Sequence, residues 1–237
     1  MKNFIIIVLL LVSPSVFAQN DTISSDEQEM INQINILRAN PKSYIPYVET
    51  YISGLLDIIK RQELAIKGYK GINKNTVVTS NTTTTTVTYS VKYKNVIENT
   101  QIREGIINTA NKNIEVANEL ISVLNTTPPV PTLILDFKLY NVSVKHLKVL
   151  KRENKFCHEC ASDGTIDERM KHLFYFGVGE NIATNTGVIN SILTLLLDIS
   201  IHDRGHRKTL LSIGEKRKWT FVSVAISDGL VVQNFAY

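Results

Sequence analysis

Hydrophobic positions recur every three or four residues along most of the chain, which predicts a largely helical protein. The first such segment carries Met30, Ile31, Ile34 and Leu37. Ser25 and Gln28 match a capping box, so the helix is predicted to begin there. Asn40-Pro41 is predicted to end it, because the residue before a proline is driven out of the helical conformation. A second helix is expected from Pro41, since proline suits a first helical turn.

Helical spacing returns in three later segments, which are residues 106–124, 139–150 and 189–196. Asp136 stands at the position of an N-cap for the second of them. Thr165 and Glu168 form another capping-box pattern, which predicts a short helix after them.

Two runs with alternating character, rich in valine and aromatic residues, stand at the C-terminal end. The segments "WTFVSVAI" and "LVVQNFAY" flank Ser227-Asp228-Gly229, a pattern that predicts a β-hairpin. Helices flanking a small antiparallel sheet indicate an α+β fold in which helices cover the sheet as a sandwich.

A change of composition interrupts this pattern at about residues 69–99, where threonine, asparagine, valine and lysine dominate. Val87, Tyr89, Val91 and Tyr93 alternate with polar residues, which favours a β-hairpin-like insertion. An irregular loop or a glycosylated linker is the alternative. We therefore predict one domain over residues 19–237, interrupted by a threonine-rich insertion.

Residues 1–18 have the pattern of a secretory signal peptide. Lys2 precedes an apolar run from Phe4 to Val12, and Ala18 marks a cleavage site before Gln19. The run is shorter than the roughly 20 residues that a membrane-spanning helix needs. We expect an exported protein, secreted or periplasmic, that is not integral to a membrane.

Overall composition narrows the choice of partner. The 237 residues are 43% hydrophobic and carry a formal net charge of +4. So small a charge favours neither nucleic acid nor an anionic membrane surface as the partner.

The two cysteines, Cys157 and Cys160, could bridge in an exported protein, closing a very small loop. They could instead help His158 to hold a metal ion.

Several polar residues stand in glycine-rich or turn-rich settings. Glu180 lies between Gly179 and Asn181, where glycine permits close backbone approach and asparagine can bond to a local turn. His158 precedes a Ser-Asp-Gly turn, and His206 lies in "DRGHRKTLL". The other histidines have simpler interpretations, with His146 predicted to be a core side chain and His172 and His202 to be exposed.

A series of short motifs occurs in a recognisable order. They are "NxxRxNPxxYxPY" from Asn35, "HxxxSDG" from His158, Arg169, "GENIA" from Gly179, "LLxD" ending at Asp198 and "RGHRKxLL" from Arg204. In this order they resemble the CAP superfamily, which comprises the cysteine-rich secretory, antigen 5 and pathogenesis-related 1 proteins and is also called SCP-like extracellular. The resemblance covers residues 26–237 apart from the insertion, and it is to the bacterial exported subtype.

The resemblance implies a three-layer α-β-α sandwich with an open groove. Two histidines and two acids line this groove and bind a divalent metal in some members. His158 and His206 match the histidines and Glu180 matches one acid, while Asp198 stands where this subtype has the second. Imidazole and carboxylate are suitable ligands for Zn²⁺. The expected cofactor is therefore Zn²⁺ or another divalent cation.

Three hypotheses for function follow. The leading one is a secreted, non-catalytic domain that binds the metal and a groove ligand, with a lipid, a sterol or a cell-envelope component as candidates. It is favoured because the chain has no "GxSxG" motif, no papain-like cysteine and no phosphate loop. The second is a hydrolase in which a metal ion activates water, or Glu180 and His206 act in acid-base catalysis. The third is an adhesive domain that binds through its insertion.

Overall fold

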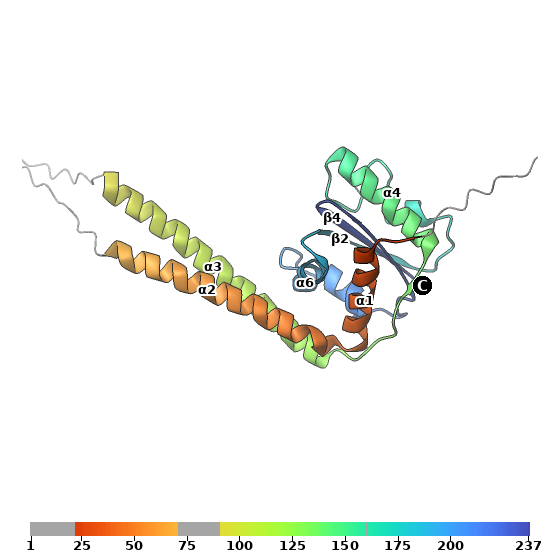
Figure 1. The fold of residues 1–237 in the computed structure, drawn as a ribbon, viewed down its shortest axis with the longest axis horizontal. Coiled ribbons are helices and arrows are strands. Elements are labelled where there is room, and N and C mark those ends of the chain that lie inside the picture. The colour runs from red at the N-terminus through yellow and green to blue at the C-terminus, as the bar shows by residue number, and fades with distance from the viewer. Residues whose placement is uncertain (1–21, 71–90, 160) are drawn as a thin grey trace, which may run out of the picture.

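The computed structural model describes residues 22–70, 91–159 and 161–237. Its elements are α1 (Ser25–Ala39), η1 (Pro41–Tyr44), α2 (Ile45–Lys70), α3 (Val91–Thr126), β1 (Ile134–Leu135), α4 (Phe137–Glu153), α5 (Ile166–Met170), β2 (Val178–Thr184), α6 (Val188–Leu197), α7 (Gly205–Leu211), β3 (Phe221–Ser227) and β4 (Leu230–Ala236). Helix α4 packs on one face of the sheet, and α1, α6 and α7 cover the other (Figure 1). The three-layer α-β-α sandwich is confirmed.

The sheet has the strand order β1-β3-β4-β2. Strands β3 and β4 form the predicted hairpin, with Ser227 opposite Leu230 and Gly229 in the turn at φ 82°. Strand β2 pairs antiparallel with β4, whereas the short β1 pairs parallel with β3. The sheet is therefore mixed at one edge, because the chain passes through α4, α5, β2, α6 and α7 before it returns beside β1.

The side chains of the hairpin point alternately to the two faces of the sheet. Val222 and Val224 belong to the larger core with α1, α6 and α7, and Ala225 packs in the smaller core under α4. On the α4 side, Ser223 Oγ lies 2.6 Å from Ser143 Oγ, which also accepts a hydrogen bond from Asn234. Both faces of the strands are thus buried, and the polar groups between sheet and α4 bond to one another.

Local capping signals fix the starts of α1, α4 and α5. Asp136 caps α4, and Thr165 with Glu168 caps α5, as predicted. The first capping box is displaced by one residue, since Ser24 and Glu27 form it and Ser25 begins the helix. The Glu27 carboxylate also accepts bonds from Tyr140 and from the backbone of strand β3. Glu27 therefore takes the place in the capping box that the sequence pattern assigned to Gln28.

Asn35 and Arg38, from the first motif of the chain, tie α1 to distant loops. The Asn35 amide exchanges two hydrogen bonds with the backbone of Leu133. The buried Arg38 guanidinium donates to the carbonyls of Pro131, Leu210 and Trp219 and to Ser212. Burial lowers the pKa of Arg38 to about 10. This motif therefore stabilises the fold and lies outside the candidate site.

Helices α2 and α3 form a long antiparallel pair that extends away from the sandwich (Figure 1). At 1.5 Å per residue, the 26 residues of α2 span about 39 Å. The expected break at Asn40-Pro41 is present as η1. The strand predicted around residues 87–93 is wrong at its C-terminal end, because Val91 and Tyr93 lie in α3. The helix that continues to Thr126 and packs along α2 overrides the β-propensity of these residues.

Several predictions fall outside the described residues. Residues 1–18, the predicted signal peptide, are among them, and so is the threonine-rich core of the insertion at 71–90. Among the helices that the structure describes, none combines the length and apolar character required to cross a membrane.

Candidate functional site

Glu180 lies in the middle of strand β2, paired with Asn234 of β4. The interpretation of "GEN" as a turn is therefore wrong, and Asn181 instead donates from its side chain to Gln233 in the sheet interior. The close approach expected at Gly179 is real, since a Cβ there would lie 3.2 Å from the Trp219 ring. Alternation along the strand turns the Glu180 side chain toward α5 and the loop that carries His158.

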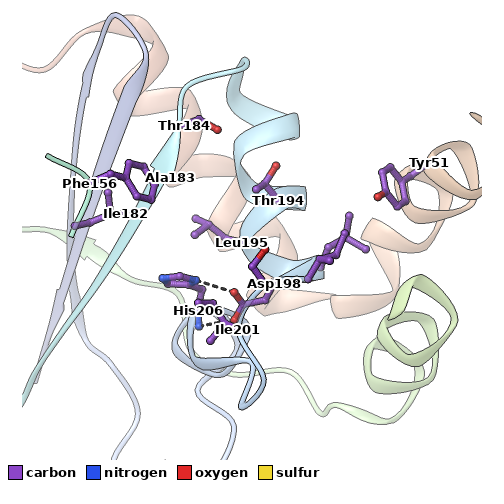
Figure 2. Close-up of a pocket in the computed structure, with 13 residues that line it drawn as sticks. Tyr51, Phe156, Ile182, Ala183, Thr184, Thr194, Leu195, Asp198, Ile201 and His206 are labelled. Atoms are coloured by element: carbon purple, nitrogen blue, oxygen red, sulfur yellow. Dashed lines mark hydrogen bonds and ion pairs between the residues drawn. The ribbon is translucent and has the colours of Figure 1, made fainter. Parts of the chain in front are cut away.

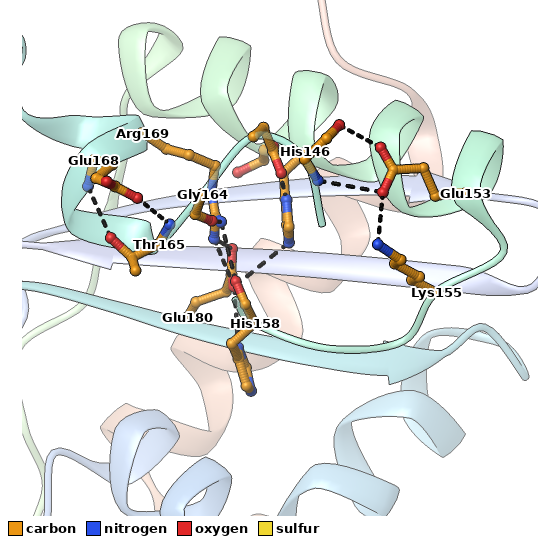
Figure 3. A network of polar contacts seen from close by, with 12 residues as sticks. His146, Glu153, Lys155, His158, Gly164, Thr165, Glu168, Arg169 and Glu180 are labelled. Carbon is orange, nitrogen blue, oxygen red and sulfur yellow. Dashed lines mark hydrogen bonds and ion pairs between the residues drawn. The ribbon is translucent and has the colours of Figure 1, made fainter. Parts of the chain in front are cut away.

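Arg169 of α5 is the principal partner of Glu180. Its Nη2 donates to both carboxylate oxygens, at 2.9 Å to Oε1 and 2.8 Å to Oε2 (Figure 3). The two side chains are only 4% and 2% exposed, so this is a buried ion pair. Arg169 Nη1 also donates to the backbone carbonyls of His158 and Gly164. One guanidinium thus holds both the carboxylate and the loop that carries His158.

Two imidazoles approach the same carboxylate. His158 Nδ1 lies 3.0 Å from Glu180 Oε1, and the Nε2 of the fully buried His146 lies 3.7 Å from the same oxygen (Figure 3). The Nδ1 of His146 lies 2.9 Å from Asp163 Oδ2. Within the described residues, His146 Nε2 has no hydrogen-bond partner. His146 is buried as predicted, but it belongs to the polar cluster between two carboxylates.

The loop between α4 and α5 is held at its other end by Glu153. Its carboxylate accepts hydrogen bonds from the backbone and hydroxyl of Ser162 and from Arg152, and it pairs with Lys155 (Figure 3). These contacts lower the pKa of Glu153 to about 2, chiefly through the Ser162 hydroxyl. Glu153 and Arg169 together position His158 beside the sheet.

His206 and Asp198 form the second pair, from adjacent elements. Asp198 follows α6 in the left-handed conformation, at φ 50°, which turns its carboxylate toward the first turn of α7. Its Oδ2 accepts from the His206 backbone N–H at 3.0 Å, and its Oδ1 lies 2.8 Å from His206 Nδ1. The carboxylate is 3% exposed and the imidazole 18%. The carboxylate of Asp198 thus reaches the imidazole of His206 directly.

The two arginines of "RGHR" support this pair from behind. The buried Arg207 donates to the carbonyls of Leu196 and Leu197 at the end of α6 and forms an ion pair with Glu119 of α3. Arg204 donates to the carbonyl of Asp198 and reaches the same glutamate. Their role is structural.

The two pairs meet through their rings. The centroids of the His158 and His206 imidazoles are 5.9 Å apart with an interplanar angle of 38°. An ionised carboxylate can only accept a hydrogen bond, so Nδ1 of each ring carries the proton and Nε2 of the neutral ring keeps its lone pair. In the described part of the chain, neither Nε2 takes part in a hydrogen bond. Two free ligand nitrogens therefore belong to neighbouring rings.

A pocket of about 430 Å³ opens beside His206 (Figure 2). Its walls are mainly apolar, and Tyr51 of α2 lies across from Ile182 and Phe156. The polar end consists of Asp198 and His206. The remaining lining residues are Ala183, Thr184, Thr194, Leu195, Leu197, Ile199, Ser200 and Ile201.

The four predicted site residues are thus brought together as two imidazole–carboxylate pairs. Across the described residues, no three His, Cys, Asp or Glu side chains are grouped so that they could hold a metal ion. The carboxylates face Nδ1 of each ring, which is the arrangement of partners that orient a metal-ligating histidine. The donor set suits an ion held by the two Nε2 atoms.

Cys157 is in a disulfide, and Cys160, the second of the two cysteines in the sequence, lies outside the described residues. A disulfide sulfur carries no thiolate, so in this state Cys157 is not available as a metal ligand. Of the two alternatives for the cysteines, the structure contains the one in which Cys157 is oxidised.

Comparisons with known proteins give one structural likeness to report. No protein-family model matches the chain, and no curated protein matches it. A solved extracellular protein containing an SCP domain, from Bacillus anthracis str. Ames, is 26% identical over 54% of this chain, with a TM-score of 0.39. The match spans 38% of the length of that protein.

Proposed function

We propose that this chain is an exported, non-catalytic domain of the CAP, or SCP-like, type that binds a divalent cation and an apolar ligand at one groove. The motifs of the sequence and the α-β-α sandwich support the family. The cation would be held by Nε2 of His158 and of His206, with Glu180 and Asp198 orienting the rings. A bound Zn²⁺ would supply a Lewis-acidic contact for an oxygen atom of the ligand.

The observation that carries this proposal is the facing pair of rings with both Nδ1 atoms engaged. A histidine ligand is usually oriented by a carboxylate at its second nitrogen, and loss of that partner typically lowers metal affinity 10- to 100-fold. Here two rings from distant parts of the chain are oriented in this way and lie 5.9 Å apart. A purely structural role for the histidines would not require their Nε2 atoms to be free.

The pocket indicates the class of ligand. Its mostly apolar wall ends at Asp198 and His206, so it suits a molecule with an aliphatic portion and a polar head. A lipid has this chemistry. The head would lie at the histidines and the chain along Ile182 and Leu195.

The hydrolase alternative is less well supported. A general base needs an oxygen within reach of the proton that it removes. Both oxygens of Glu180 are bonded to Arg169, and its side chain is 2% exposed. If the hydrolase alternative were correct, peptide cleavage by the purified protein would disappear in Glu180→Gln.

Calorimetric titration of metal-stripped protein with Zn²⁺ tests the cation. We expect equimolar binding in the wild type, loss of binding in His158→Ala and in His206→Ala, and no change in His172→Ala, which removes an exposed histidine outside the pair. No heat in the wild type, or equal heat in His206→Ala, would remove the cation from the proposal.

Binding of a fluorescent long-chain fatty acid tests the pocket. Thr194→Trp places a large ring in the pocket and should abolish binding, whereas Thr109→Trp on α3 should not. Equal binding by both variants would rule out this pocket as the ligand site.

A further inference from the structure

Two phenylalanine side chains between α5 and β2 are almost completely exposed. Phe174 is 89% exposed and Phe176 is 85% exposed, the highest values among the large hydrophobic residues described. Single exposed apolar residues are common on protein surfaces, but two neighbouring aromatic rings form a patch that usually marks an interaction site. Neither residue lines the pocket beside His206.

The segment that carries these rings is firmly attached to the fold. Tyr175, between them, turns inward, where its ring lies 6.0 Å from that of Phe221 and its hydroxyl donates to the Asp136 carboxylate. The backbone N–H of Phe176 donates to the carbonyl of Tyr237 at 2.9 Å. The alternation of out, in and out therefore holds both phenyl rings toward solvent.

Phe174 adopts a conformation that its side chain disfavours. Its φ is 58°, in the left-handed region where a bulky non-glycine residue is uncommon. Glycine would suit this backbone better. Such strain persists where the surroundings impose it, and it is concentrated at functional positions. The chain thus keeps an aromatic ring where stability alone would favour its removal.

One cationic side chain contacts the patch, and two more are exposed in the adjoining segments. Arg217 lies over the Phe176 ring, with its guanidinium carbon 5.7 Å from the ring centroid. Lys216 beside it and Lys171 before Phe174 are exposed. Three acids, Asp167, Glu168 and Glu215, lie in the same segments; Glu168 is engaged in the cap of α5. Lys218, the next cation, donates to the carbonyl of Ser212.

We propose that Phe174 and Phe176, flanked by Lys171, Lys216 and Arg217, form a surface that docks the protein onto an anionic lipid bilayer. Phenyl rings gain free energy on entering the boundary between headgroups and acyl chains. Lysine and arginine beside them are attracted to the negative surface of the bilayer. The net charge of +4 did not indicate such a partner, because a total charge does not show how cations gather around an apolar patch. This surface is independent of the proposed cation site.

A tryptophan reporter tests contact through this patch alone. Phe176→Trp should show a blue-shifted emission, and quenching by brominated acyl chains, with vesicles of phosphatidylglycerol and phosphatidylcholine in equal parts. Vesicles of phosphatidylcholine alone should give at least a fivefold smaller effect. Ile134→Trp, at another exposed position on β1, should not be quenched. The native Trp219 is buried and adds a constant background.

Removal of the rings tests whether they carry the binding. Phe174→Gly combined with Phe176→Ser should weaken binding to the mixed vesicles at least tenfold, since burial of each ring is worth about a factor of ten. Phe174→Gly alone should melt no lower than the wild type, so lost binding would not reflect unfolding.

Replacement of the cations tests the electrostatic contribution. Lys216→Ala combined with Arg217→Ala should weaken binding by about fivefold for each cation and reduce its sensitivity to salt. An unquenched Phe176→Trp reporter would overturn the proposal, as would equal quenching of the Ile134→Trp reporter. Full binding by the variant without rings would also overturn it. If the wild-type protein associates with itself in the absence of vesicles, and the phenylalanine variants do not, the patch would bind a second copy of the chain instead of a bilayer.

Discussion

The two imidazole–carboxylate pairs of the candidate site are assembled in different ways. Asp198 and His206 lie eight residues apart and bond twice, once through the ring and once through the backbone. Glu180 and His158 come from a strand and a loop, and their geometry depends on Arg169 and Glu153. The first pair is set by a left-handed residue after α6, with Arg204 and Arg207 bonded to the carbonyls around it. The second needs a buried cation and a tethered loop.

The difference lies in what each carboxylate requires for its burial. Asp198 is buried beside a backbone N–H and an imidazole that both belong to His206, eight residues further along the chain. Glu180 is buried beside a guanidinium whose own burial it compensates. Burying an unpaired charge is costly, so Glu180 and Arg169 depend on each other. The first pair should thus influence mainly the cation, and the second both the cation and the fold.

The largest effect is expected from Arg169→Met. It leaves the Glu180 charge buried without its cation and should lower the free energy of unfolding by about 3–5 kcal/mol, measured by urea denaturation. Glu180→Gln in the same chain should recover part of the loss, because the uncompensated charge is then gone. A loss of stability below about 1 kcal/mol, or the absence of rescue by Glu180→Gln, would mean that the Arg169–Glu180 ion pair does not support the Glu180–His158 pair.

Asp198→Asn should affect the orientation of the His206 ring more than the stability of the fold. The amide can no longer hold the His206 Nδ1–H as a charged acceptor does, so Zn²⁺ affinity should fall about 10- to 100-fold. The free energy of unfolding should change by only about 1–2 kcal/mol, because one charged hydrogen bond becomes neutral. Calorimetry and urea denaturation of the same sample measure both. Unchanged affinity would show that Asp198 does not orient a ligand.

The smallest effect concerns the tether of the His158 loop at acidic pH. The pKa of Glu153 in the folded state is about 2, below its ordinary value of 4.5. Its stabilising effect is therefore complete above pH 4.5 and disappears as the pH falls toward 2. The difference in unfolding free energy between wild type and Glu153→Gln should shrink over this range. If the difference in unfolding free energy between the two proteins stayed constant from pH 6 to pH 2, Glu153 would not tether the His158 loop.

Local signals made much of the fold predictable. Asp136, Thr165 with Glu168, and the turn at Asp228-Gly229 act within a few residues, and the structure has them as predicted. The first cap was displaced by one residue because two consecutive serines, Ser24 and Ser25, stand at the start of α1, and the long-range bonds of Glu27 favour Ser24 as the cap. The helix at Val91 was missed because valine and tyrosine favour strands unless a partner helix packs against them.

The candidate site was predictable only in part. The sequence pattern indicated His158, Glu180, Asp198 and His206, and the structure brings them together as two pairs. Arg169 was noticed in a motif but received no role, and His146 was assigned to the core. Their function depends on the crossing of α4, α5 and β2, which no local pattern encodes. A histidine on an otherwise apolar helix face needs a polar partner when it is buried, and this is the signal that could have revealed His146.

The most direct test of the central claim is the tautomeric state of the two rings, measured by long-range proton–nitrogen correlation NMR at a pH where both are neutral. The account predicts that His158 and His206 carry the proton on Nδ1, and that added Zn²⁺ shifts the Nε2 resonances of these two rings and leaves those of His172 unchanged. Protonation on Nε2 in either ring, or a Zn²⁺-induced shift confined to other histidines, would contradict it.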